Sequence, residues 1–241
     1  MSNHTLRGAL VIYRRLVAEL CPYHCWFCHA RGMTFQDLCQ SCGNDLPRIA
    51  QSCRLCATDL VVGDLCGRCL QNPPPWDRAG VPLRYELPVD YLVQRFKYSD
   101  DSSAGKLCGS LLSAALPTDV QGHVVAVPMH RKRYIQRGFN HSGVLARDVS
   151  TACQLPLAKI ARRTRHTDPQ VGLAARDRRR NLRVAFAVSP AHTLGQPLIL
   201  VDDILTTGET LRSLTLACKH AGYGVVTILC LARAGRVRTQ T

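Results

Sequence analysis

The fold is decided by one stretch of the sequence, Leu198-Ile199-Leu200-Val201-Asp202-Asp203-Ile204-Leu205-Thr206-Thr207-Gly208-Glu209-Thr210. Its aliphatic run predicts a buried strand that ends in two adjacent carboxylates, after which a Thr/Gly turn opens a helix. A helix N-terminus presents unpaired N–H groups and a partial positive charge, to which the threonines add hydroxyl donors. The stretch therefore predicts a cradle sized for one phosphate.

The two carboxylates, Asp202 and Asp203, indicate what lies beside that phosphate. They would repel a bare polyphosphate, so we expect them to face sugar hydroxyls or a metal ion. Phosphate on one side and a diol on the other describe a phosphorylated ribose. The alternative is an ordinary strand–turn–helix junction with Thr caps and exposed acids. Two carboxylates at the end of a buried strand are costly for a mere cap, which favours the binding site.

Strand and helix patterns alternate around this stretch, which predicts an α/β domain with a parallel sheet. An amphipathic helix is expected at 6–20. The predicted strands are 79–86, 124–128, 157–162, 198–201 and 224–231. The predicted helices of the body are 88–98, 104–116, 140–153 and 209–221.

Nine of the 13 cysteines lie between Cys21 and Cys69. Eight of them form four Cys-x-x-Cys pairs, Cys25/Cys28, Cys39/Cys42, Cys53/Cys56 and Cys66/Cys69. Two such knuckles complete a tetrahedral set of soft ligands, which suits zinc. The spacing predicts two structural zinc ions whose closed coordination leaves no position for catalysis. Metal binding would supply folding free energy that a segment with so small a core lacks.

The cysteine spacing admits other interpretations. A redox dithiol or a buried apolar thiol is disfavoured by four knuckles in succession. Iron–sulfur binding uses the same ligands and stays open. Sequential pairing of the knuckles, 25/28 with 39/42 and 53/56 with 66/69, needs only short loops and is preferred. A cross-braced pairing also stays open.

Charge is as uneven as the cysteines. The formal net charge is +14, and residues 129–183 alone hold 14 basic and 3 acidic residues. The proline run after Asn72 predicts a stiff linker. The expected organisation is a helix at 1–20, a double zinc-ribbon-like domain at 21–72, a linker at 73–78 and the body at 79–241. Because we find neither a signal peptide nor an apolar run of membrane length, we expect a cytoplasmic protein without membrane insertion.

Residues 202–208 resemble the phosphoribosyl pyrophosphate (PRPP) signature of type I phosphoribosyltransferases. With the four knuckles, the whole chain resembles the ComF/GntX family, competence-type proteins linked to the use of external DNA. Further segments in the family's order support this, namely Val127–Arg133, Arg137–Asn140, Arg162–Arg165, Pro169–Leu173 and Arg178–Leu182. The resemblance implies a type I phosphoribosyltransferase-like parallel sheet with helices, preceded by a small four-cysteine zinc-ribbon-like head.

The resemblance also implies roles for individual residues. Asp202 and Asp203 would hold the ribose hydroxyls of PRPP, directly or through Mg²⁺. The 5′-phosphate would be cradled by Thr206, Thr207, Gly208, Glu209 and Thr210. The pyrophosphate loop, which neutralises charge on the leaving group, would be Met129, His130, Arg131, Lys132 and Arg133. A flexible loop that closes over the substrate would carry Arg163, Arg165, Arg176, Arg178, Arg179 and Arg180.

Three functions fit these features. The first is an accessory protein of DNA uptake or utilisation, with single-stranded DNA and proteins of the uptake machinery as candidate partners, since a basic body suits phosphate contacts. The second is a Mg²⁺-dependent transfer of phosphoribose from PRPP to a nitrogen acceptor. The third is a PRPP or nucleotide sensor without chemistry. Thr206 replaces the Asp of purine-salvage enzymes, which disfavours a purine base, and the acceptor stays open.

Overall fold

The computed structural model describes residues 23–33, 37–99, 101–129, 134–135, 138–164 and 186–235. It divides into two compact units, Met1–Leu46 and Pro47–Thr241. The predicted helix at 6–20 lies outside the described residues. Within the described ranges, no helix combines the length and the apolar character that a membrane crossing requires.

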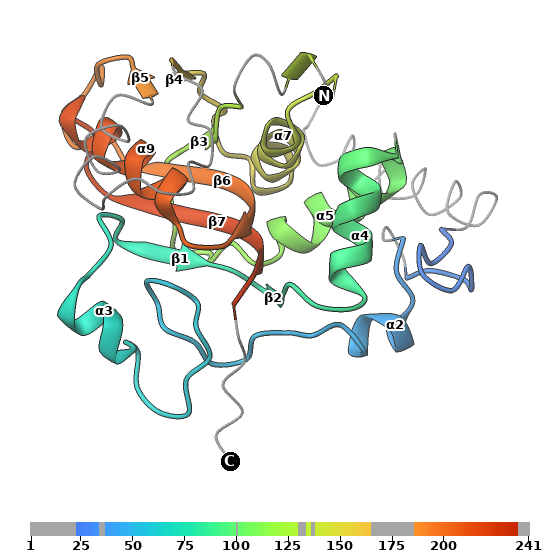
Figure 1. Ribbon diagram of the computed structural model, residues 1–241. Helices are drawn as coiled ribbons and strands as arrows, with labels where there is room; N and C mark the ends of the chain where they lie inside the picture. The colour runs from blue at the N-terminus through green and yellow to red at the C-terminus, as the bar shows by residue number, and fades with distance from the viewer. Residues whose placement is uncertain are drawn as a thin grey trace, which may run out of the picture. The chain divides into compact units, whose positions relative to one another are not determined.

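A parallel sheet forms the centre of the larger unit (Figure 1). Its strand order is β1 (Arg78–Gly80), β7 (Val226–Arg233), β6 (Leu198–Leu205) and β3 (His123–Ala126), with the short β2 (Leu83–Arg84) also paired to β7. Every one of these pairings is parallel. β7 is buried along nearly its whole length, as expected of a strand covered on both faces. The predicted α/β architecture is confirmed.

Helices supply the cover of this sheet. They are α4 (Val89–Tyr98), α5 (Ser102–Ser113), α7 (His141–Cys153) and α9 (Glu209–His220). α5 packs on α7, and α7 packs on β3 and β6. On α9, one stripe of apolar residues joins a buried cluster with Leu200 and Ile228 of the sheet. Such a stripe is what an amphipathic helix buries against a sheet.

The strands predicted at 124–128 and 224–231 correspond to β3 and β7 with ends displaced by one or two residues, and the other three differ as follows. The strand at 79–86 is split into β1 and β2, because Pro82 has no N–H to continue the ladder. The strand at 157–162 is shifted to β4 (Ala161–Arg163), which pairs antiparallel with β5 (Phe186–Val188), a strand the sequence did not predict. The strand at 198–201 continues to Leu205, because β7 pairs with it that far. Asp202 and Asp203 therefore lie inside β6 and not beyond its end.

Two short helices begin within cysteine knuckles, each directly after the first cysteine of its pair. α2 (Gln40–Asn44) begins after Cys39 in the smaller unit, and α3 (Gly67–Gln71) begins after Cys66 in the larger unit. The second set of four cysteines thus belongs to the same compact unit as the sheet. Trp76, within the segment predicted as a linker, is buried there.

Candidate metal centres and phosphoribosyl site

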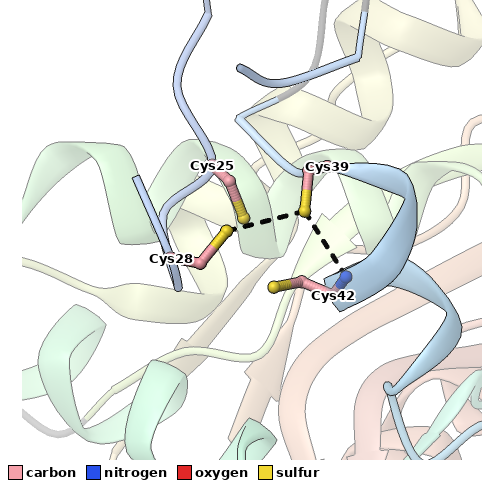
Figure 2. Close-up of side chains that lie close together, drawn as sticks. All are labelled: Cys25, Cys28, Cys39 and Cys42. Atoms are coloured by element: carbon pink, nitrogen blue, oxygen red, sulfur yellow. Dashed lines mark hydrogen bonds between the residues drawn. The ribbon is translucent and has the colours of Figure 1, made fainter. Parts of the chain in front are cut away.

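The first cysteine group consists of Cys25, Cys28, Cys39 and Cys42. Their four Sγ atoms lie within 4.8 Å of one another, and those of Cys28 and Cys39 are 3.6 Å apart (Figure 2). A tetrahedral metal with bonds of about 2.3 Å to sulfur requires sulfur atoms about 3.8 Å apart. All four are free thiols, so the donor set fits zinc.

The second cysteine group consists of Cys53, Cys56, Cys66 and Cys69, with the same 4.8 Å limit between sulfur atoms. The Sγ atoms of Cys56 and Cys66 are 3.6 Å apart. Each group therefore contains two knuckles that are consecutive in sequence. The structure therefore confirms the sequential pairing of the knuckles. It does not show the cross-braced pairing.

The first knuckle of each group is a tight hairpin, and the two hairpins have the same backbone conformation. His29 after Cys28 has φ 60°, and Ala57 after Cys56 has φ 53°. In each hairpin the N–H of the first cysteine donates to a carbonyl five residues later, over 2.7 Å in the first group and 2.8 Å in the second. The chain thus repeats one candidate metal-binding hairpin, which the sequence showed only as a recurring Cys spacing.

Backbone amides favour the thiolate form at one position in each group. Burial opposes ionisation of Cys25, but N–H groups of Cys39, Cys28 and Phe27 outweigh it and lower its pKa to about 6. In the second group burial likewise opposes ionisation of Cys53, and neighbouring amides lower its pKa to about 7. The thiolate is the metal-binding form of cysteine, so these amides favour that form at one ligand position of each group.

Side chains from α7 and α4 bind the two carboxylates of β6. Asp202 Oδ1 accepts a hydrogen bond from Ser142 Oγ of α7 at 2.8 Å and another from the N–H of Asp203 at 3.0 Å. Asp203 Oδ2 lies 2.6 Å from Nζ of Lys97 at the end of α4, and both side chains are less than one-fifth exposed. Lys97 and Ser142 were missed by sequence reasoning, because only the tertiary structure brings α4 and α7 beside β6.

The environment favours the neutral form of Asp202. Burial is the main cause, the charge of Asp203 adds to it, and the hydrogen bond from Ser142 opposes it. Together they raise the pKa of Asp202 to about 7. A cation or a diol that enters beside this carboxylate would favour the ionised form.

The signature turn, residues 206–208, connects these acids to α9. Gly208 has φ 79°, and a Cβ atom there would lie 3.0 Å from Cη2 of Trp76. Glycine is therefore required both for its backbone conformation and for the space. Thr206, Thr207 and Glu209 are exposed, and the first N–H groups of α9 have no carbonyl of the helix to bind.

The predicted loops are described only in part. Met129 follows β3, whose continuation lies beside β6, since the N–H of Val127 donates to the carbonyl of Val201 at 2.9 Å. His130, Arg131, Lys132 and Arg133 lie outside the described residues. Arg163 lies in β4, with its guanidinium carbon 5.6 Å from the ring centre of Phe186. Arg165, Arg176, Arg178, Arg179 and Arg180 also lie outside the described residues.

Curated proteins similar to this chain carry related names. The chain is 31% identical over 220 residues to Competence protein F of Haemophilus influenzae, covering 86% of this chain and 96% of that protein. It is 32% identical over 223 residues to DNA utilization protein YhgH of Escherichia coli strain K12, covering 88% and 97%. It is 26% identical to Competence protein ComFC of Streptococcus pneumoniae, covering 81% and 87%. No family model matches the chain.

Among solved structures, the chain is similar to one described as the allosteric regulatory enzyme of purine biosynthesis. That likeness has a TM-score of 0.41 at 18% identity and covers 57% of this chain and 29% of the other. A second is glutamine PRPP amidotransferase from B. subtilis complexed with ADP and GMP, with a TM-score of 0.40 at 17% identity. This one covers 56% of this chain and 30% of the other.

Proposed function

This chain belongs to the ComF/GntX family of competence and DNA utilization proteins, and from that premise we propose that it is a cytoplasmic accessory protein of DNA uptake or utilisation whose body binds PRPP. The two cysteine groups hold structural zinc ions in this proposal. Single-stranded DNA and proteins of the uptake machinery are its proposed partners.

One observation carries the PRPP part of the proposal. Two carboxylates lie near the end of β6, separated only by Ile204 and Leu205 from the turn that leads into α9, so sugar-binding acceptors and phosphate-binding donors lie close together in the chain. Carboxylate oxygens accept hydrogen bonds from a ribose diol or bind Mg²⁺. The N–H groups at the start of α9 and the threonine hydroxyls donate to a phosphate. The carboxylates and these donors all lie at the carboxyl end of β6, and open α/β sheets bind ligands at the carboxyl ends of their strands.

Lys97 refines this site. Its ammonium group neutralises Asp203, and the two side chains are largely shielded from solvent. A diol or Mg²⁺ that binds Asp203 would take over part of this neutralisation. We therefore expect Lys97 to move from the carboxylate toward the phosphate or pyrophosphate of the ligand when PRPP binds.

Titration calorimetry with PRPP, in the presence and absence of Mg²⁺, tests the proposal. Wild-type protein should bind PRPP when Mg²⁺ is present, and Asp203→Asn should weaken binding at least tenfold, or about 1.4 kcal/mol. Asp119→Asn is the matched control, since Asp119 is an exposed carboxylate paired with Arg78. If wild-type protein releases no heat of binding with Mg–PRPP, the PRPP proposal is wrong.

The alternative functions share this site and differ in turnover. Release of pyrophosphate from PRPP in the presence of a nitrogen acceptor, abolished by Asp202→Ala, would support phosphoribosyl transfer. A rise in melting temperature with PRPP but without pyrophosphate release would support sensing.

The DNA part is tested separately with a fluorescent single-stranded oligonucleotide. Binding through phosphate contacts should weaken linearly in a plot of log affinity against log salt concentration. Affinity that is independent of salt, or no retention at low salt, would contradict a role of the basic stretch in DNA binding.

A further inference from the structure

Arg233, the last residue of β7, connects the second cysteine group to the signature turn. Its Nε donates to the carbonyl of Cys56 at 3.0 Å. Its Nη1 donates to the carbonyl of Leu205 at 2.8 Å and to that of Thr206 at 2.6 Å, and also to that of Ala234. One guanidinium, with donors in a rigid plane, thus binds a metal-ligand residue and the start of the signature turn at once.

Trp76 makes a second connection between the same two places. Its indole Nε1 donates to the carbonyl of Leu55, between Cys53 and Cys56, at 2.6 Å. The ring of Trp76 is in tight contact with the signature turn at Gly208, where a Cβ atom would lie 3.0 Å away. Only 6% of Trp76 is exposed, so the indole is fixed in this position.

The hairpin of the second cysteine group is itself part of the core of the larger unit. Ala57 is 1% exposed and belongs to the buried cluster that includes Leu205 and Leu211. The backbone N–H of Ala79 in β1 donates to the carbonyl of Arg54 at 2.8 Å. The first cysteine group, by contrast, belongs to the unit Met1–Leu46.

These contacts connect the backbone of the turn to the hairpin of the second group. A metal bound by Cys53 and Cys56 fixes the hairpin between them, and with it the carbonyls of Leu55 and Cys56 that Trp76 and Arg233 bind. Without the metal, the four thiols have no common centre, and both anchors lose fixed acceptors. A phosphate site is sensitive to shifts of about 1 Å in its donors.

We propose that the second cysteine group positions the phosphate-binding turn through Arg233 and Trp76, so that ligand binding in the body is coupled to metal at Cys53, Cys56, Cys66 and Cys69 and not to metal at the first group. This inference rests on the proposed PRPP site. Arg233 and Trp76 are positioning residues, since they act through the backbone of the turn. By thermodynamic reciprocity, a bound ligand must then stabilise the metal at the second group.

The test measures release of zinc from the full-length, zinc-loaded protein to a zinc-selective colorimetric chelator, with and without Mg–PRPP. Of the two ions, we expect one to be released at least about tenfold more slowly when Mg–PRPP is bound. In Cys39→Ser, which removes the ion of the first group, the remaining ion should be the protected one. Equal protection of both ions, or of neither while Mg–PRPP binds, overturns the inference.

Arg233→Lys tests the connecting residue, because lysine keeps the positive charge but cannot reach the hairpin and the turn together. It should retain two zinc ions, bind Mg–PRPP at least tenfold more weakly and lose the protection. Arg84→Lys is the matched control. Arg84 of β2 likewise binds the segment after the hairpin of the second group, through Asp59 at 2.8 and 2.9 Å, but its remaining hydrogen bond goes to the carbonyl of Arg48 and not to the turn. If both variants bind Mg–PRPP as tightly as wild type, the inference is wrong.

Hydrogen exchange separates this inference from the proposed function. Amide exchange in residues 205–210 should accelerate in Arg233→Lys and when the chelator removes both ions, but not in Cys39→Ser. If wild-type protein does not bind Mg–PRPP, the proposed function fails and this measurement still decides the coupling. Unchanged exchange in Arg233→Lys would refute it.

Discussion

Replacing Asp202 by asparagine should make the protein more stable while it weakens ligand binding. The carboxyl is held in a site that favours its neutral form, mainly because of burial and then because of the neighbouring charge of Asp203. Asparagine is neutral at every pH and keeps an Oδ1 acceptor for Ser142 and for the N–H of Asp203. The substitution therefore removes the cost of the charge and keeps the geometry.

The pKa of Asp202 gives the magnitude and the sign. It is raised from 3.8 to about 7 in the folded protein. A group whose folded pKa is raised stabilises the fold fully below its unfolded pKa, and this contribution is lost as pH rises through the folded value. Three units of pKa correspond to a maximum of about 4 kcal/mol above pH 8. The advantage of Asp202→Asn should grow by about 1–2 kcal/mol between pH 6 and pH 8.5.

Urea denaturation followed by circular dichroism at pH 6 and pH 8.5 measures this difference. Asp119→Asn is the control, because the pKa of that exposed carboxyl is lowered by its hydrogen bond from Arg78. That control should show no gain at either pH. If the stability difference between Asp202→Asn and wild type is the same at both pH values, the raised pKa of Asp202 is wrong.

Three further outcomes follow from the same contacts. Cys39→Ser should lower the zinc content, measured by atomic absorption, from two ions to one, because three thiolates no longer close a tetrahedral site; a content of two would contradict the assignment of the first group. Lys97→Met should lower the free energy of unfolding by about 1–3 kcal/mol, since it leaves a largely buried carboxylate without its cation, whereas Lys97→Arg should be milder. Melting curves that do not distinguish these two variants would show that the pair contributes little. Gly208→Ala should cost about 1–2 kcal/mol more than Gly138→Ala in urea denaturation, because both glycines have positive φ, of 79° and 77°, but only at Gly208 does a Cβ atom meet another side chain. Equal losses would mean that the indole ring can move away.

Local patterns predicted most of the elements. The helix predicted at 140–153 is α7 (His141–Cys153), and the one at 209–221 is α9 (Glu209–His220). Hydrophobic periodicity is a property of adjacent residues, so it can be read without the fold. Strand ends were less predictable. β6 reaches Leu205 because its partner β7 continues to Arg233, and that pairing joins parts of the chain that no local window contains.

The sequence by itself determined the two four-cysteine groups, the parallel α/β body and the stretch in which acids precede a glycine turn, because each is encoded in short spacings. The pyrophosphate and flexible loops remain predictions, since most of their residues lie outside the described ranges. Only the tertiary structure decided that Lys97 neutralises Asp203 and that Ser142 binds Asp202. It alone joined Arg233 to Cys56, 177 positions away in the chain. Such contacts depend on how the strands and helices pack, and no local pattern of residue types encodes them.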